Sequence, residues 1–332
     1  MRVGVIGAGA VGGVIAALLD RAGHDVEVTA RGAHLEAIGE SGLRLSGGWG
    51  EHVAVVEAGD VLTRAPELAV VATKAQDAPA AIRENIRLLR GIPVLVVQNG
   101  LDGVAAAAAA SPRSDIVGGL ATFAASYLSP GEVSVTTPGP TYVGVLGDDD
   151  VPARYVARIL GEVMPMVVLT NFAGAQWTKL IINQVNALPA ITGLSVQEVV
   201  AHRGLRRLMT ASIREAVRVG RASRVRFEKL QGLGRRALWW FSIAPLWAGE
   251  VLPRLMARRM GRVPNPGSTL QSIRRGQATE IDHLNGAVVR AAEALGRPAP
   301  VNALLVQLVH EVEESGRFFT PDEVVSRSRR TP

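Results

Sequence analysis

VGVIGAGAVG, residues 3–12, is the stretch of sequence that decides the fold. Its first four residues are apolar or glycine and predict a buried strand, and a match to the pattern G-x-G-x-x-G follows at once. Gly7 permits a tight turn, Gly9 allows close approach to a pyrophosphate, and Gly12 lets helix and strand pack closely. The sequence therefore predicts a dinucleotide-binding loop, with a ligand-free glycine-rich turn as the alternative; the loop consists of Gly7, Ala8, Gly9, Ala10, Val11 and Gly12.

The first half of the chain alternates short strand-like runs with helical stretches, which predicts a parallel sheet with right-handed crossovers. The fold class that follows is α/β, with a Rossmann-type, doubly wound N-terminal domain. Thr-Pro-Gly-Pro divides residues 132–136 from residues 141–146, which predicts an antiparallel hairpin near the sheet edge. The predicted strands of the parallel sheet are residues 3–6, 26–29, 53–56, 68–73, 94–97 and 115–117.

The second half of the chain has a different pattern, because strand signals nearly vanish after residue 174. Helical periods fill residues 176–190, 205–222, 270–295 and 301–314. We therefore place the domain boundary at residue 170. Residues 1–170 are predicted to form the nucleotide-binding domain, and residues 171–332 an all-helical C-terminal domain for substrate binding and catalysis.

Composition narrows the class of protein. The 332 residues include no cysteine, which excludes disulfide frameworks, cysteine-ligated zinc, Fe–S clusters and thiol catalysis. The formal charge is +6, but only 4% of residues are aromatic and no basic stripe carries interleaved aromatics, so a nucleic-acid partner is not expected. The longest apolar run, residues 237–249, is shorter than the roughly 20 residues of a spanning helix. We expect a cytoplasmic protein without a stable membrane span.

The end of the second predicted strand indicates which dinucleotide binds. A carboxylate there would accept a hydrogen bond from a ribose 2′-hydroxyl, but the strand ends Val28-Thr29-Ala30-Arg31. Arg31 places a planar, permanently charged guanidinium at this point, which suits a 2′-phosphate and predicts NADPH/NADP+ as cofactor. Lys74, just after another strand, is a second candidate cation for that phosphate. A surface arginine without a ligand is the alternative for Arg31.

Polar residues elsewhere in the chain suit a reaction site. Asn99 follows the strand at 94–97 and is a candidate to orient a carboxamide or substrate, or else is an ordinary turn residue before glycine. In the predicted helix 176–190, Lys179, Asn183 and Asn186 lie within roughly 60° of one another on a mostly apolar surface. A partly desolvated Lys179 has a lowered pKa and can give up a proton near neutrality. A lysine that extends to solvent and two bridging asparagines are the alternative.

In the predicted helix 270–295, Glu280 lies beside an apolar stripe, where a carboxylate needs a cation. Lys179 is the obvious partner. Ser268, twelve residues earlier, is placed about three helical turns away on the same side. A solvated glutamate is the alternative.

Taken together these motifs resemble the ketopantoate reductase (2-dehydropantoate 2-reductase) family. The resemblance covers nearly the whole chain in order, and TEID-x-x-NG with K-L-x-x-N is far more specific than the glycine pattern. The motifs are GAGAVGG at the start, Arg31, VATKAQD around Lys74, QNG at Asn99, WTKLIIN around Lys179, and GSTLQSI with TEIDHLNG at residues 267–286.

The resemblance implies reduction of 2-dehydropantoate to (R)-pantoate with NADPH, on the route to pantothenate. It implies that Lys179 is the general acid and that Glu280 binds the substrate hydroxyl and pairs with Lys179. It also implies that Arg31 and Lys74 hold the 2′-phosphate. No metal is required, since the cofactor carries out the redox chemistry. The candidate substrate-binding residues are Asn99, Asn183, Asn186, Ser268 and Glu280.

Two departures from the family pattern bear on the substrate. The family's second helix asparagine is replaced by Ala187, and Asn186 can substitute from one position earlier. Residues 235–247, with three of the five tryptophans, are longer and more apolar than usual. They suit a lid over a bulkier substrate or a homodimer contact, ordinary helical core, or an interfacial membrane helix. A paralogous reductase of a bulkier 2-oxo acid and a non-catalytic NADP(H)-binding protein remain alternatives.

Overall fold

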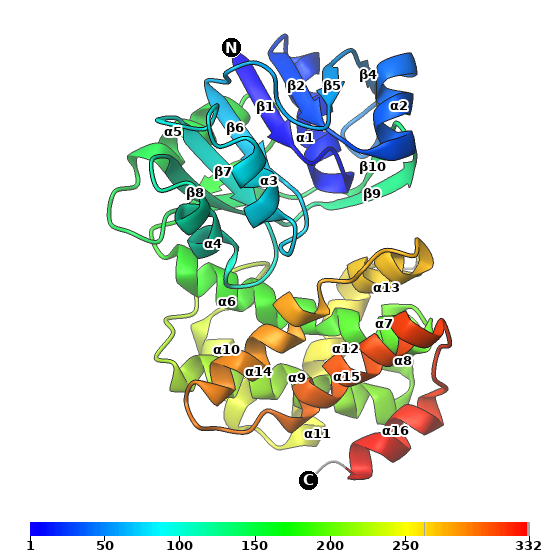
Figure 1. The fold of residues 1–332 in the computed structure, drawn as a ribbon. Coiled ribbons are helices and arrows are strands. Elements are labelled where there is room, and N and C mark those ends of the chain that lie inside the picture. Colours follow the sequence, from blue (N-terminus) through cyan, green and yellow to red (C-terminus); the bar gives the residue numbers. More distant parts are fainter. Residues whose placement is uncertain (262, 331–332) are drawn as a thin grey trace. The chain divides into compact units, whose positions relative to one another are not determined.

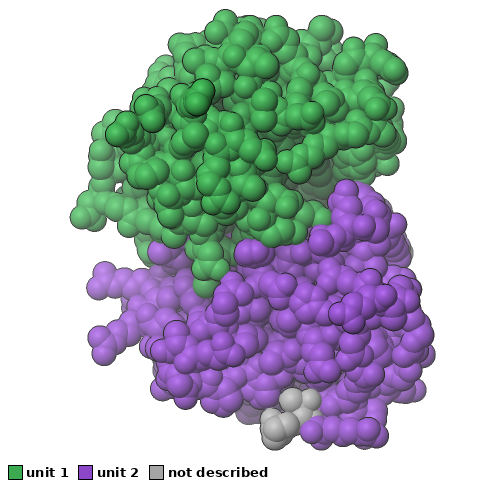
Figure 2. Space-filling view, viewed as in Figure 1, with its two compact units in different colours: residues 1–172 green, residues 173–332 purple. Residues whose placement is uncertain are grey.

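The computed structural model of the chain describes residues 1–261 and 263–330. The chain forms two compact units, unit 1 with residues 1–172 and unit 2 with residues 173–332 (Figure 2). The sequence places the boundary at residue 170. Among the described residues, no helix combines the length and the apolar character that crossing a membrane requires.

Unit 1 is built on an eight-stranded sheet in the order β12-β11-β8-β7-β6-β1-β2-β5 (Figure 1). Neighbouring strands run parallel, except that β11 is antiparallel to β8. The strands are β1 (Arg2–Ile6), β2 (Asp25–Thr29), β5 (Glu57–Gly59), β6 (Leu68–Val71), β7 (Pro93–Val97), β8 (Asp115–Ala121), β11 (Thr141–Gly144) and β12 (Met166–Val168). The central strands read as continuous β-branched runs because both of their faces are buried.

Helices cover both faces of this sheet. The helices α1 (Ala10–Arg21) and α5 (Val151–Leu160) contribute to one apolar core, and α3 (Ala78–Glu84) and α4 (Gly103–Ala110) contribute to the other. The arrangement confirms the predicted doubly wound α/β class. A further helix, α2 (Gly32–Ser41), follows β2 and was not predicted from the sequence.

A second, four-stranded sheet corrects two predictions. Its order is β4-β3-β10-β9, from β3 (Leu43–Gly47), β4 (His52–Ala54), β9 (Ala124–Ser129) and β10 (Glu132–Thr137). The run at 53–56 therefore leaves the main sheet, and residues 132–136 do not pair with residues 141–146. Residues of β10 alternate between buried and partly exposed. The buried face packs on α1, where the Val133 side chain lies against Gly13. Strand periodicity gave no information on these long-range pairings.

Unit 2 is helical and is organised around the long helix α9 (Arg203–Ala222). The chain enters it through α6 (Phe172–Asn183), which is followed by the short turn η1 (Gln184–Asn186). The remaining helices are α7 (Ala187–Thr192), α8 (Val196–Ala201), α10 (Arg235–Ile243), α11 (Leu246–Gly249), α12 (Val251–Arg259), α13 (Gly267–Arg274), η2 (Ile281–His283), α14 (Asn285–Glu293), α15 (Pro300–Ser315) and α16 (Pro321–Arg330) (Figure 1).

Two predicted helices are interrupted. The helix at 176–190 breaks at η1, because Pro189 has no N–H and its ring would clash with the carbonyl four residues earlier. The helix at 270–295 ends at Arg274, and Gly276 follows with φ of +63°. Helical extrapolation from Ser268 to Glu280 is therefore wrong, since the residues between them are only partly helical.

Candidate active site

The glycine-rich loop of unit 1 combines a tightly packed turn with open space at the start of α1. Gly7 has φ of +95°, and a Cβ on Gly12 would lie 2.0 Å from the Gly7 carbonyl oxygen. By contrast, a Cβ on Gly9 would meet nothing within 4 Å. Gly9 caps α1 without any side-chain hydrogen bond, so no side chain competes for the N–H groups of the first turn. Gly7 and Gly12 are therefore required by the fold, whereas nothing in the packing of the loop requires a glycine at position 9.

Two side chains outside the motif hold this loop in place. Thr29, at the end of β2, accepts the Gly7 N–H on its Oγ1 (2.9 Å) and the Ala8 N–H on its carbonyl oxygen (2.8 Å). His34 Nδ1 accepts the Gly131 N–H at 2.9 Å, so its proton lies on Nε2, which donates to the Ala8 carbonyl oxygen at 2.7 Å. Sequence reasoning missed His34, because its partners are 26 and 97 residues away and leave no local pattern.

Strand register aligns the other predicted residues of unit 1 along one edge of the sheet. Ile6 pairs with Thr29 on one side and with Val71 on the other, and Val71 pairs with Val96. The carboxyl ends of four neighbouring parallel strands thus lie level, which is where ligands bind in open α/β sheets. The three residues predicted for this edge all lie within three residues of a strand end: Arg31, Lys74 and Asn99.

Arg31 lies at this edge with its side chain 72% exposed. Its Nη2 is 3.7 Å from a carboxylate oxygen of Glu84, the last residue of α3, which is itself 47% exposed. An ion pair this long and this exposed is weak. The guanidinium is therefore available to a stronger anion, and Glu84 is a competitor that the sequence pattern did not indicate.

In unit 2, Lys179 and Asn183 lie one turn apart on α6 and thus share a face of the helix. The Lys179 side chain keeps some accessible surface, yet burial of its charged end lowers the pKa to about 8. Within residues 1–261 and 263–330, the Lys179 amine makes no hydrogen bond or ion pair. A lysine with this pKa is protonated at neutral pH and can release its proton readily.

Asn186 lies in η1, and the structure brings it next to the start of α13. Its Oδ1 would lie 2.6 Å from a Cβ on Gly267, which has φ of +71°. Ser268 follows Gly267 and is exposed. Asn183 and Asn186 are both 8% exposed, whereas Ala187, at the position of the family's second asparagine, is fully buried. Asn186 therefore lies beside Gly267, the residue that precedes Ser268 at the start of α13.

Glu280 does not form the ion pair with Lys179 that the sequence and the family resemblance suggest. In the described part of the chain no such contact exists, and Glu280 has other interactions. It lies just before η2, in a segment fixed to α15: Glu313 accepts the Thr279 N–H at 2.7 Å. His310 contacts both Glu313 (2.7 Å) and Asp282 (3.1 Å). The helix break explains the difference, because Glu280 is not on a continuous helical face.

Asn285, part of the TEIDHLNG motif, belongs to a buried polar cluster. Its Nδ2 donates to Gln184 Oε1 at 2.8 Å and to Asn302 Oδ1 at 2.9 Å, and Ser212 Oγ lies 3.0 Å from both of these oxygens, to either of which its single proton can be donated. All four side chains are fully buried. The cluster joins η1 to α14 and α15, so this motif asparagine holds the helices together.

Comparison with known proteins places the chain in a family. The model described as Ketopantoate reductase PanE/ApbA matches residues 3–148, and Ketopantoate reductase PanE/ApbA C terminal matches residues 171–313. A 2-dehydropantoate 2-reductase of Archaeoglobus fulgidus is 30% identical over 318 residues, covering 94% of this chain and 98% of that protein. The chain belongs to the ketopantoate reductase family. The resemblance inferred from the sequence is confirmed, and the chain is an oxidoreductase.

Other members of the ketopantoate reductase family match at similar length. A 2-dehydropantoate 2-reductase of Pyrococcus horikoshii is 26% identical over 95% of this chain and 99% of that protein. A solved ketopantoate reductase of Ralstonia eutropha JMP134 superposes with a TM-score of 0.80 at 29% identity, over 95% of this chain and 99% of that chain. D-mandelate dehydrogenase, solved with NADH and anilino(oxo)acetate, gives 0.83 at 21% identity over the same shares and shows a common fold.

Proposed function

We propose that this member of the ketopantoate reductase family reduces a 2-oxo acid with NADPH, and that 2-dehydropantoate is the substrate and (R)-pantoate the product. The observation that carries the proposal is the Lys179 amine, with its pKa near 8, on one face of α6 with Asn183. NADPH, when bound, would supply a hydride for the ketone carbon. Negative charge then grows on the ketone oxygen, where an ammonium stabilises it and donates the proton that completes the hydroxyl.

The remaining residues are assigned to binding. The loop of residues 7–12 suits the pyrophosphate, since Gly9 leaves open space before the uncapped first turn of α1. Arg31 and Lys74 are proposed to hold the 2′-phosphate, and Asn99 to orient the carboxamide or substrate. For the substrate, we propose Asn183, Asn186, Ser268 and Glu280, with the Glu280 carboxylate accepting the substrate hydroxyl.

A substrate panel tests this function directly. Loss of NADPH absorbance is followed with 2-dehydropantoate, with 2-oxoisovalerate, which lacks the hydroxymethyl group, and with an aryl-substituted 2-oxo acid. The proposal expects the highest kcat/KM with 2-dehydropantoate, because only this substrate offers a hydroxyl to Glu280. A higher kcat/KM with the aryl substrate would select the paralogous reductase instead, which the replacement by Ala187 makes a real competitor.

The cofactor assignment has its own measurement. Calorimetric titration with NADPH and with NADH should give binding free energies that differ by about 2 kcal/mol or more in favour of NADPH, because of charge-assisted bonds to the phosphate. Equal constants would refute the roles of Arg31 and Lys74. Tight NADPH binding without turnover of any 2-oxo acid would select the non-catalytic alternative.

A further inference from the structure

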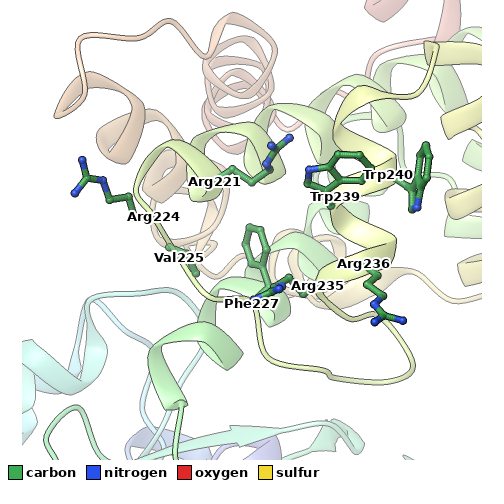
Figure 3. A pocket seen from close by; sticks show the side chains of 8 residues that line it. All are labelled: Arg221, Arg224, Val225, Phe227, Arg235, Arg236, Trp239 and Trp240. Carbon is green, nitrogen blue, oxygen red and sulfur yellow. The ribbon is translucent and has the colours of Figure 1, made fainter.

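A cavity of about 500 Å³ in unit 2 is not used by the proposed reaction. It lies between the C-terminal end of α9, the loop that follows it and the first turns of α10 (Figure 3). Its lining is formed by arginines and apolar or aromatic side chains: Arg221, Arg224, Val225, Phe227, Arg235, Arg236, Trp239 and Trp240.

The cavity is strongly cationic. Among the eight described residues that line it, four are arginines and none is acidic. In the described part of the chain, the side chains of Arg224, Arg235 and Arg236 have no carboxylate partner. The nearby Glu228 carboxylate accepts the Lys229 N–H. Unpaired guanidinium groups around one space favour an anion, and phosphate or carboxylate oxygens match their donors.

Part of this cationic lining is ordered in advance. Arg221 donates to Ser242 Oγ, whose hydroxyl donates to the Trp239 carbonyl oxygen at 2.7 Å. Arg218 donates to the Ser242 carbonyl oxygen at 3.1 Å and fixes the same end of α10 to α9. At its other end, α10 begins after Gly234 without a side-chain cap, so its uncapped N–H groups and positive dipole end lie beside Arg235 in the lining. Because these contacts already order this part of the lining, binding an anion here costs little conformational entropy.

The rest of the lining is aromatic. Phe227 is 7% exposed, while Trp239 and Trp240 are 43% and 64% exposed and pack edge to face at 4.9 Å. Figure 3 shows Phe227 and Trp239 between Arg224 on one side and Arg236 on the other. Such a surface suits a ligand with both a planar or apolar part and an anionic group.

The cavity is lined by α9, the loop after it and α10, and this loop packs on a face of α6 other than the face that carries Lys179. Thr178 Oγ1 donates to the Glu228 carbonyl oxygen at 2.7 Å, which ties the loop after α9 to α6. Phe227 and Trp177 both pack at Gly220. At about 100° per residue, Lys179 is roughly 160° around the helix from Trp177. The cavity therefore does not open beside the proposed general acid.

We propose that this cavity is a second binding site, for an organic phosphate or carboxylate that carries an aromatic or apolar group. A second copy of the chain is a poor occupant, since a symmetric contact would bring the four arginines toward their own images. The same ligand chemistry occurs in free aryl or acyl phosphates and in anionic lipid headgroups. The proposal is independent of the reductase substrate.

Calorimetric titration of the full chain with phenyl phosphate, inorganic phosphate and phenol tests the site. We expect phenyl phosphate to bind at least tenfold more tightly than either fragment, since only phenyl phosphate uses both kinds of lining. The double substitution Arg224→Gln/Arg236→Gln should weaken phenyl phosphate binding about tenfold or more, from the lost charge-assisted bonds. The control Arg258→Gln/Arg297→Gln removes the same charge from exposed positions that do not line the cavity and should leave binding unchanged.

A vesicle arm identifies the source of the ligand. Co-sedimentation with phosphatidylglycerol vesicles but not phosphatidylcholine vesicles, lost in the cavity variant and kept in the control, would support a lipid headgroup. Binding of phenyl phosphate alone would support a free ligand. The proposal is overturned if neither probe binds, if inorganic phosphate binds as tightly as phenyl phosphate, or if both double variants bind equally. Dissociation of a homodimer by Trp240→Glu in sedimentation velocity would also overturn it, because a second copy of the chain would then occupy the cavity.

Discussion

In unit 1 the side chains assigned to the cofactor follow the ends of neighbouring parallel strands, whereas in unit 2 those assigned to the reaction lie where helices are interrupted. The register that pairs Ile6 with Thr29 and Val71 fixes the strand ends, and so restricts the backbone positions of Arg31 and Lys74. In unit 2 the breaks at η1 and after α13 decide which way Asn186 and Glu280 face. A sheet edge thus fixes its polar residues through backbone pairing, while a helical site depends on breaks and caps.

Removal of the Lys179 amine should have the largest effect. Lys179→Met is expected to lower kcat about 10²-fold or more, as for a lost general acid, while Lys229→Met, at an exposed loop position, should leave kcat unchanged. In the wild type, the rate of reduction should fall as the pH rises through about 8, because the acid must be protonated. Steady-state rates of the three proteins over a pH series measure both effects.

The same substitution should stabilise the fold. Burial lowers the folded-state pKa of Lys179 to about 8, below its unfolded value, so the buried ammonium costs stability at neutral pH. That cost should diminish as the pH rises from about 8 toward the unfolded pKa. Lys179→Met should therefore raise the free energy of unfolding at pH 7 by about 1 kcal/mol, allowing for the accessible part of the side chain. A Met variant that was both inactive and less stable would argue that Lys179 is a structural residue.

The sequence predicted unit 1 better than unit 2 for a physical reason. The strands at 3–6, 26–29, 68–73, 94–97 and 115–117 correspond to β1, β2, β6, β7 and β8, since continuous β-branched runs between glycines have few other structures available. The small sheet was not predicted, because β3 and β10 are paired across more than 80 residues. Pro189 and Gly276 are local signals of the two helix breaks. The predictions of helices at 176–190 and 270–295 gave more weight to the spacing of apolar residues than to these two residues.

Gly12 and Gly9 allow the stability of the loop to be tested separately from its binding of NADPH. Gly12→Ala would place a Cβ 2.0 Å from the Gly7 carbonyl oxygen and should lower the free energy of unfolding by about 2 kcal/mol or more. Gly9→Ala meets nothing within 4 Å and should lower it by less than about 1 kcal/mol, while NADPH binding weakens at least tenfold. Denaturant unfolding and calorimetry on both variants supply the comparison. Unchanged NADPH affinity in Gly9→Ala would contradict the phosphate-binding role of this loop.

His34 tests whether the loop needs a support that its own motif does not provide. His34→Ala removes the bonds to Ala8 and Gly131 and should raise the NADPH dissociation constant about tenfold, because the loop must be ordered by the ligand. His34→Gln keeps a donor for the Ala8 carbonyl and an acceptor for the Gly131 N–H, and should restore most of the affinity. If Gln bound NADPH as weakly as Ala, or if Ala bound it as well as the wild type, the hydrogen-bonded bridge would have no part in cofactor binding.

The smallest expected effect is that of Glu84. Its substitution tests how far a carboxylate on α3 weakens the binding of an anion by Arg31, which follows the end of β2. Glu84 lies 3.7 Å from Arg31 and opposes a 2′-phosphate at the same guanidinium. Glu84→Gln should therefore tighten NADPH binding about two- to threefold and leave NADH binding unchanged, as expected for an exposed pair screened by solvent. Glu40→Gln, an exposed substitution on α2 with the same change of charge, is the matched control. Equal gains in both variants would indicate a general effect of net charge. Equal gains with NADPH and NADH would mean that Arg31 does not bind the 2′-phosphate.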